Sequence, residues 1–177
     1  MPRPNNFAFI DGANLHITYE YLDWKLDYQK LRNYLKKRLD VTFAFYFLGN
    51  VEENVDLYTT LESYDYTLRL KEPSPYVTKE EYCPHCHLSI APEMTRYKAD
   101  CDSYLTLEAI SNMSIYDKAV LITSDGDFDN LVKKLLLQDK LRVVFAPCRV
   151  GCSWLLKSAA RGRIAYIDDY RTELEKL

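Results

Sequence analysis

The fold is decided by the stretch Phe7-Ala8-Phe9-Ile10-Asp11-Gly12-Ala13-Asn14, an apolar run that ends in a carboxylate and a turn. A second run of the same design is Leu121-Ile122-Thr123-Ser124-Asp125-Gly126-Asp127-Phe128. Buried strands that end in Asp and continue into a helix place their carboxylates along one edge of a sheet, the edge at which open α/β sheets bind ligands. We therefore expect Asp11, Asp125 and Asp127 to lie close together.

The rest of the chain alternates between strand and helix patterns, which is typical of a mostly parallel sheet with helices on both faces. The strongest helix signal covers 128–136, where apolar residues recur at i, i+3, i+4, i+7 and i+8. We expect strands at 7–10, 41–48, 64–70, 120–123, 141–146 and 164–167, and helices at 27–39, 52–62, 105–113, 128–136 and 153–160, followed by a short C-terminal helix. The sequence predicts a single α/β domain over 1–177.

The segment 71–97 interrupts this alternation. It contains four prolines and the sequence Cys83-Pro84-His85-Cys86-His87. A plain crossover would be shorter, so we interpret 71–97 as an insertion within the domain. A C-x-x-C pair is half of a zinc site, which makes Cys83 and Cys86 candidate ligands of a structural Zn²⁺ and the insertion a candidate zinc knuckle with about one ion per chain.

The remaining zinc ligands are open at this point. His85 or His87 is one source, and Cys148 with Cys152 is another if the insertion folds back over the sheet edge. The alternative is that Cys148 and Cys152, like Cys101, are small core residues.

Composition narrows the classes of function. The chain has 177 residues, 47% of them hydrophobic, and a net charge of −3, which neither requires nor excludes a local nucleic-acid surface. No apolar run reaches about 18 residues, so we expect no membrane span. Residues 1–6 lead into the first strand without a signal-peptide pattern, so we expect a cytoplasmic location with reduced cysteines. A glycine-rich P-loop is absent, which argues against Walker-type nucleotide hydrolysis.

A third acidic motif, Asp100-Cys101-Asp102, stands at the start of a helical pattern. Either Asp could be a plain helix cap, and one Asp of the 124–128 motif would also suffice as a cap. Together, however, the three motifs hold more carboxylates than capping needs. Gathered at one edge they would repel each other, and a hard divalent cation with oxygen ligands would offset that repulsion.

These three motifs, in this order, resemble the NYN domain family of the PIN-like nucleases. The resemblance runs from about Phe7 to Asp169 and includes a closing helix and strand at 153–168. It implies a Rossmann-like PIN fold and Mg²⁺- or Mn²⁺-dependent cleavage of RNA. It also implies catalytic and metal-binding roles for Asp11, Asp102, Asp125 and Asp127, with Asn14 and Ser124 as polar support at the substrate.

Two features depart from the family pattern. The insertion at 71–97 is longer than a minimal domain needs, and Glu108 stands where Asp is expected. If Glu108 reaches the site, the exchange would weaken metal binding; otherwise it is a neutral change on a helix flank.

Basic residues near the predicted edge are candidate contacts for a phosphate backbone. Lys98 is close in sequence to Asp102, and Arg149 and Lys157 flank Trp154, whose ring is available to stack on a base if it is exposed. The alternative is a solvated charged face.

We therefore predict a metal-dependent endoribonuclease whose partner is RNA, most consistent with single-stranded RNA. The alternatives are a non-catalytic RNA-binding or regulatory module of the same fold, and a phosphatase acting on small molecules. A homo-oligomer is one open alternative for the assembly state.

Overall fold

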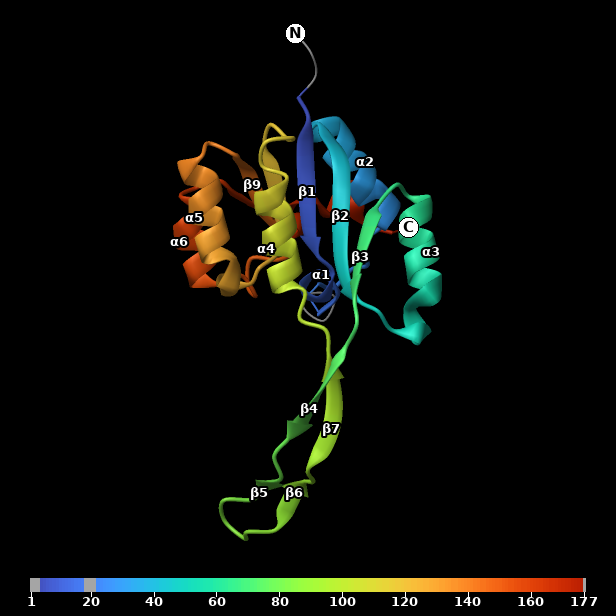
Figure 1. The fold of residues 1–177 in the computed structure, drawn as a ribbon, viewed down its shortest axis with the longest axis vertical. Coiled ribbons are helices and arrows are strands. Elements are labelled where there is room, and N and C mark those ends of the chain that lie inside the picture. Colours follow the sequence, from blue (N-terminus) through green and yellow to red (C-terminus); the bar gives the residue numbers. More distant parts are fainter. Residues whose placement is uncertain (1–3, 18–21, 177) are drawn as a thin grey trace.

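The computed structural model describes residues 4–17 and 22–176, which form a parallel β-sheet covered by helices on both faces, with a long arm projecting from one edge (Figure 1). The sheet has six strands in the order β10-β9-β8-β1-β2-β3, and every neighbouring pair is parallel. The strands are β1 (Asn6–Asp11), β2 (Val41–Gly49), β3 (Thr67–Lys71), β8 (Ala119–Ile122), β9 (Leu141–Ala146) and β10 (Ile164–Tyr166). The predicted α/β fold is confirmed.

The helices divide between the two faces of the sheet. They are α1 (Gly12–Ile17), α2 (Tyr28–Arg38), α3 (Val55–Ser63), α4 (Asp102–Ser111), α5 (Asp129–Leu137), α6 (Trp154–Ala160) and α7 (Arg171–Leu174), with single turns at Glu52–Asn54, Gly126–Phe128 and Ile167–Tyr170. Helices α4, α5 and α6 cover one face, and α2 and α3 lie across the other (Figure 1).

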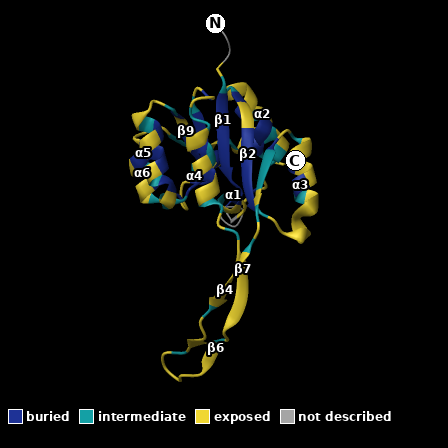
Figure 2. Cartoon of the chain, in the orientation of Figure 1, coloured by how far each residue is buried: buried dark blue, intermediate teal, exposed yellow. Residues whose placement is uncertain are grey.

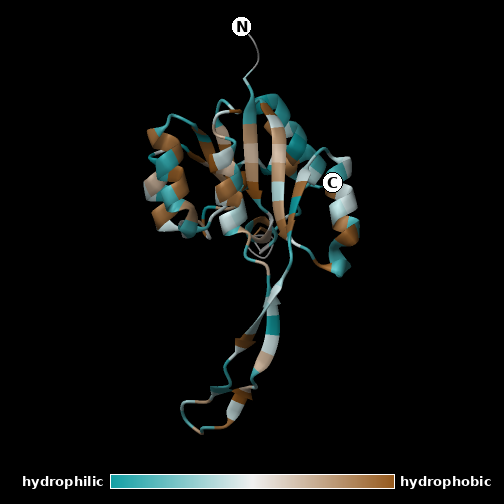
Figure 3. Ribbon diagram, viewed as in Figure 1, coloured by the Kyte–Doolittle hydropathy of each residue, from teal (hydrophilic) through white to brown (hydrophobic). Residues whose placement is uncertain are grey.

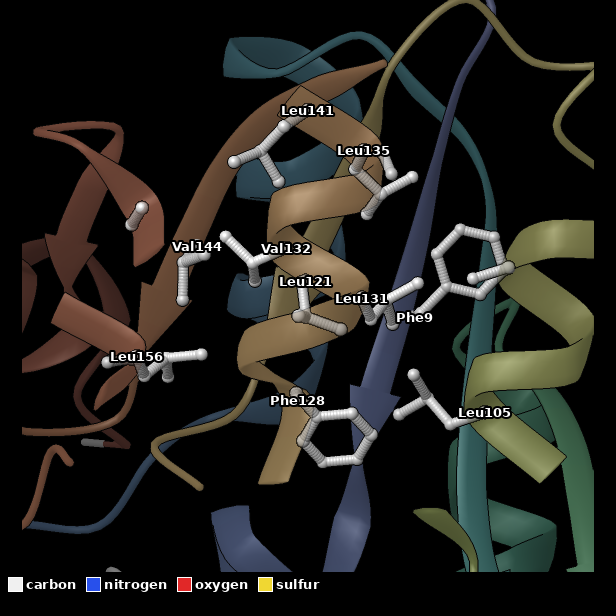
Figure 4. Packing of buried hydrophobic residues seen from close by; sticks show 14 of the residues in the cluster. Phe9, Leu105, Leu121, Phe128, Leu131, Val132, Leu135, Leu141, Val144 and Leu156 are labelled. Carbon is white, nitrogen blue, oxygen red and sulfur yellow. The ribbon is translucent and has the colours of Figure 1, made fainter. Parts of the chain in front are cut away.

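Successive side chains along each strand point to opposite faces of the sheet and so contribute to two separate hydrophobic cores. Phe7, Phe9 and Leu121 pack with residues of α4, α5 and α6, whereas Ala8 and Ile10 pack with residues of α1, α2 and α3. Figure 4 shows the first of these cores, in which Leu131 and Val132 of α5 lie near Leu121, with Leu105 of α4 on one side and Leu156 of α6 on the other. Because both faces are covered, the central strands are buried along their whole length (Figure 2).

The order of the strands reverses its direction between β1 and β8. The chain runs from β1 outward to β2 and β3, then crosses over and runs outward in the other direction through β8, β9 and β10. At such a reversal the loops that leave the two central strands diverge, and ligands bind outside the carboxyl ends of the strands. Asp11 ends β1, and the Asp125 loop follows β8.

The segment 71–97, predicted as an insertion, forms most of the arm, which leaves the sheet at the carboxyl end of β3 and returns to α4 (Figure 1). Its base is an antiparallel pair of β4 (Ser74–Thr78) and β7 (Met94–Lys98), and its tip is a smaller pair of β5 (Glu81–Tyr82) and β6 (Ser89–Ala91). Most of its residues are exposed (Figure 2). Figure 3 shows that hydrophobic residues occur along it all the same.

Candidate metal centre and nucleic-acid interface

The site begins with Asp11, whose side chain is buried at the end of β1 with 7% exposure. One carboxylate oxygen accepts a hydrogen bond from the Asn14 amide at 3.0 Å, and the other accepts one from the Thr123 hydroxyl at 3.1 Å. The same Thr123 oxygen accepts the Asp125 amide at 3.1 Å. Thr123 thus fixes Asp11 relative to the Asp125 loop. The sequence alone predicts no role for Thr123, and the only signal for one is a polar residue directly after the apolar strand β8.

A second set of hydrogen bonds joins α1 to the loop after β8. The Asn14 side-chain oxygen accepts both the amide and the hydroxyl of Ser124, at 2.9 and 2.8 Å. The Ser124 carbonyl in turn accepts the Ser153 amide at 2.9 Å. A Cβ on Gly126 would lie 2.5 Å from the Ser153 hydroxyl oxygen, so glycine permits this close approach. Asn14 and Ser124 therefore link α1, the loop after β8 and the start of α6 at the sheet edge.

Three carboxylates converge at this edge. Asp102, Asp125 and Asp127 each offer an oxygen, and these oxygens all lie within 4.8 Å of one another. In an octahedral Mg²⁺ site with bonds of about 2.1 Å, opposite ligands are about 4.2 Å apart and adjacent ones about 3 Å apart. The three side chains therefore suit one divalent cation after small adjustments of their rotamers.

Other atoms of the same acidic motifs accept the hydrogen bonds that cap the helices. Asp100 accepts the Asp102 amide at 3.2 Å, so Asp100 closes the turn that starts α4 and the Asp102 carboxylate belongs to the cluster. Asp125 accepts the Asp127 amide at 3.0 Å through one of its oxygens. The three carboxylates of the cluster therefore come from the start of α4 and from the capped turn at Gly126–Phe128.

Electrostatics at the site follow from burial and like charge. The pKa of Asp102 is raised to about 6, chiefly by burial and then by the charges of Asp100, Asp11 and Asp125, in that order. The pKa of Asp11 is also raised, chiefly by burial and to a smaller extent by Asp125, against the hydrogen bonds from Asn14 and Thr123. Carboxylates held together without a counter-charge behave in this way, and a bound cation would favour their ionised forms.

Glu108 does not belong to the cluster. It forms a salt bridge with Arg69 at 3.0 Å and accepts a hydrogen bond from Asn112. Glu108 therefore lies on the flank of α4, and its replacement of the expected Asp does not alter the acidic cluster.

The predicted basic residues lie on two sides of the edge. Lys98 ends β7 and pairs with Asp100 at 3.7 Å, beside the start of α4. Arg149 pairs with Asp169 at 2.8 Å and stacks over the Tyr166 ring, and the Lys157 ammonium donates to the Arg149 carbonyl at 3.1 Å. The last two therefore share one surface, on the loop and helix that follow β9.

Trp154 stands beside that basic surface and is 73% exposed. It is the first residue of α6, next to Ser153, which contacts the Asp125 loop through Ser124 and Gly126. Trp154 therefore contributes little to the core, and its neighbour Ser153 connects the start of α6 to the Asp125 loop.

A groove of about 1030 Å³ opens on the other side of Asp11. Its walls come from α1, the end of β2, the loop at 50–54 and the base of the arm, including His16, Tyr97 and Lys98. A Cβ on Gly12 would lie within 2.6 Å of Tyr46, Leu48 and a backbone oxygen, so only glycine lets α1 turn away this close to β2.

The cysteines separate into two groups. Cys148 and Cys152 are buried, one in each core, and among the described residues neither joins Cys83 and Cys86 in a group of three or more candidate metal ligands, so both are core residues. Cys83 and Cys86 lie at the tip of the arm, where the Cys83 sulfur accepts hydrogen bonds from the amides of Cys86 and His85 and from the Cys86 thiol, which lowers the Cys83 pKa.

Within residues 4–17 and 22–176, no helix combines the length and the apolar character needed to cross a bilayer.

Comparison with known proteins agrees with this architecture. The chain is 24% identical over 181 residues to low amplitude and bright protein LabA from Synechococcus elongatus, covering 98% of this chain and 90% of LabA. The crystal structure of a protein of unknown function from Vibrio parahaemolyticus superposes with a TM-score of 0.70 at 21% identity, over 98% of both chains. The model of the NYN domain matches residues 7–168. The chain therefore belongs to the NYN domain family, which is part of the PIN-like nucleases.

Proposed function

We propose that this protein is a divalent-metal-dependent endoribonuclease that cleaves single-stranded RNA at the acidic edge between β1 and β8. The observation that carries the proposal is the convergence of Asp102, Asp125 and Asp127 within 4.8 Å, in a member of the NYN family. Chains that only bind RNA have no need to hold three like charges within 4.8 Å of one another.

A bound Mg²⁺ or Mn²⁺ would supply an activated water and neutralise charge developing on the phosphate. The protein's own residues would hold the cation and orient it relative to the scissile phosphate. Asp102, Asp125 and Asp127 are the ligands, and Asp11 adds a fixed negative charge at the floor of the site. Thr123 orients Asp11, while Asn14 and Ser124 keep the loops together beside the scissile phosphate.

The surroundings of the acidic edge are suited to a polyanion. Lys98 on one side, and Arg149 with Lys157 on the other, offer cationic groups where the carboxylates alone would repel RNA. Trp154 offers an exposed ring for a base, and the groove beside Asp11 is large enough for a nucleotide. We propose that the RNA strand passes from the Trp154 surface across the carboxylates towards the groove.

All five cysteine thiols are free, which fits a cytoplasmic location.

The test is cleavage of labelled single-stranded RNA by the purified full chain, with Mg²⁺, with Mn²⁺ and with EDTA. We expect cleavage in the two metal buffers, none in EDTA, and none for Asp11→Asn or Asp125→Asn. Asp56→Asn, an exposed change on α3, is the matched control and should retain activity. Unchanged cleavage by both site variants would overturn the assignment.

The same preparation separates the alternatives. RNA retention without cleavage in any metal would make the protein a binding module. Hydrolysis of a small phosphate monoester, with RNA and single-stranded DNA left intact, would instead make it a phosphatase.

A further inference from the structure

The tip of the arm is shaped as a metal-binding turn. The Cys83 amide donates to the Leu88 carbonyl at 2.8 Å, and the His87 amide donates to the Cys83 carbonyl at 2.9 Å, which closes a tight loop between β5 and β6. His87 adopts a φ of 57°, a left-handed conformation that a non-glycine residue takes up at some cost. Because the Cys86 thiol and the amides of His85 and Cys86 all bond to the Cys83 sulfur, the two sulfurs lie on the same side of the loop.

This turn supplies two ligands and no more. Over the described part of the chain, the acidic cluster at the sheet edge is the one place where three or more candidate ligand atoms lie within 4.8 Å of each other. His85 and His87 therefore do not join the two thiols, and Cys148 and Cys152 are buried in the cores. A structural Zn²⁺ takes four ligands in tetrahedral geometry, so the tip is half of a site.

The arm also lacks a core of its own. Paired two-stranded ribbons are at best marginally stable in water unless something covers one face. Its large apolar side chains are exposed, among them Tyr76, Val77, Tyr82, Leu88, Ile90, Met94 and Tyr97. An identical arm meeting the tip about a two-fold axis would supply the two missing thiolates and cover apolar surface at the same time.

We propose that the arm tip is half of a tetrahedral zinc site, and that Cys83 and Cys86 of a second copy of this chain complete it, so that one Zn²⁺ joins two chains. Four cysteine thiolates are a common ligand set for structural zinc. Since the arm projects from the same sheet edge as the acidic cluster, the joined arms would connect two such edges in one particle (Figure 1).

The test combines elemental analysis with mass measurement in solution, on full-length chain purified without chelator. We expect about half a zinc per chain, the content of one four-thiolate site shared by two chains, and the mass of a dimer. A strong chelator should produce monomers, and added Zn²⁺ should restore the dimer.

Variants make the result specific. Cys83→Ser with Cys86→Ser should give a zinc-free monomer with an unchanged circular dichroism spectrum, because the tip lies outside both cores. His85→Ala, in the same turn, is the matched control and should keep the zinc and the dimer. One zinc per chain in a monomer, a zinc-free native chain, or a dimer that survives removal of its zinc would each overturn the proposal. None of these readouts depends on RNA cleavage, so the proposal stands or falls independently of the proposed function.

Discussion

The central strands and the arm both carry large apolar side chains, yet only the strands bury them. Ile10 and Leu121 are fully buried between two layers of helices, whereas Val77 and Leu88 on the arm are 60% and 69% exposed. The strands are held in place by packing within the chain. The arm has hydrogen bonds between its strands but no layer of helices to pack against. The acidic site stands between these regions, since the strands position Asp11 and Asp125 and the arm leads into Asp102.

The largest expected effect tests that contrast directly. Leu121→Ala should lower the free energy of unfolding by about 2–5 kcal/mol, because it removes a buried side chain and leaves a cavity. Ile90→Ala on the arm should change it by less than about 0.5 kcal/mol when measured with chelator present. Urea unfolding of both variants provides the comparison. Equal losses would show that the arm packs against the rest of the chain in solution.

A smaller effect is expected at the basic surface beside the site. Arg149→Glu with Lys157→Glu should weaken binding of single-stranded RNA by about tenfold and lower the slope of log affinity against log salt by about 1.4, the value for two lost phosphate contacts. The matched control reverses two exposed charges away from the edge, Arg142→Glu with Lys134→Glu. Filter binding over a range of salt measures both. An unchanged affinity and slope would place the RNA surface elsewhere, on the arm in the first instance.

The smallest effect concerns the stability of the metal-free site. The folded protein holds the pKa of Asp102 at about 6, above its ordinary value of 3.8, so ionised Asp102 destabilises the fold. This cost is absent below about pH 3.8, grows as the pH rises towards 6, and is complete above that pH. Asp102→Asn should therefore raise the melting temperature in EDTA at pH 7.5 by about 2–4 °C, or about 1 kcal/mol after allowance for partial exposure.

Two controls sharpen the Asp102 prediction. The gain should shrink towards zero near pH 4, where the parent carboxyl is protonated too. Asp56→Asn should show no such gain at either pH. A lower melting temperature for Asp102→Asn in EDTA would contradict the account of the site's electrostatics.

How much the sequence reveals depends on the region. Alternation and helical spacing predict the sheet because each apolar position faces one core or the other, and the strand ends then bring Asp11, Asp125 and Asp127 to one edge. The six residues of α1 are too few to show a helical period, so spacing alone does not reveal the bounds of this helix. The arm strands β4 to β7 face no core, so their pattern carries no signal of pairing.

Two polar residues have structural roles that the sequence alone does not predict. Arg32 is buried with its guanidinium donating to the carbonyls of Asp65, Val41 and Thr42, which a helical pattern of polar residues does not reveal. Thr123 links Asp11 to the Asp125 loop through two hydrogen bonds that depend on the neighbouring strand. Sequence spacing identifies the carboxylates of the site, but the groups that orient them come from the three-dimensional pairing of β1 with β8.

The most direct test of the central claim is calorimetric titration with Mn²⁺, in a Cys83→Ser, Cys86→Ser background so that the arm thiols bind none of it. The account predicts one binding event in this parent and a loss of affinity of about tenfold or more on adding Asp125→Asn and Asp127→Asn. Glu108→Gln, a carboxylate outside the cluster, should leave the affinity unchanged. Equal Mn²⁺ affinity in the parent and in the Asp125→Asn, Asp127→Asn variant would contradict the claim that the acidic edge is the metal centre.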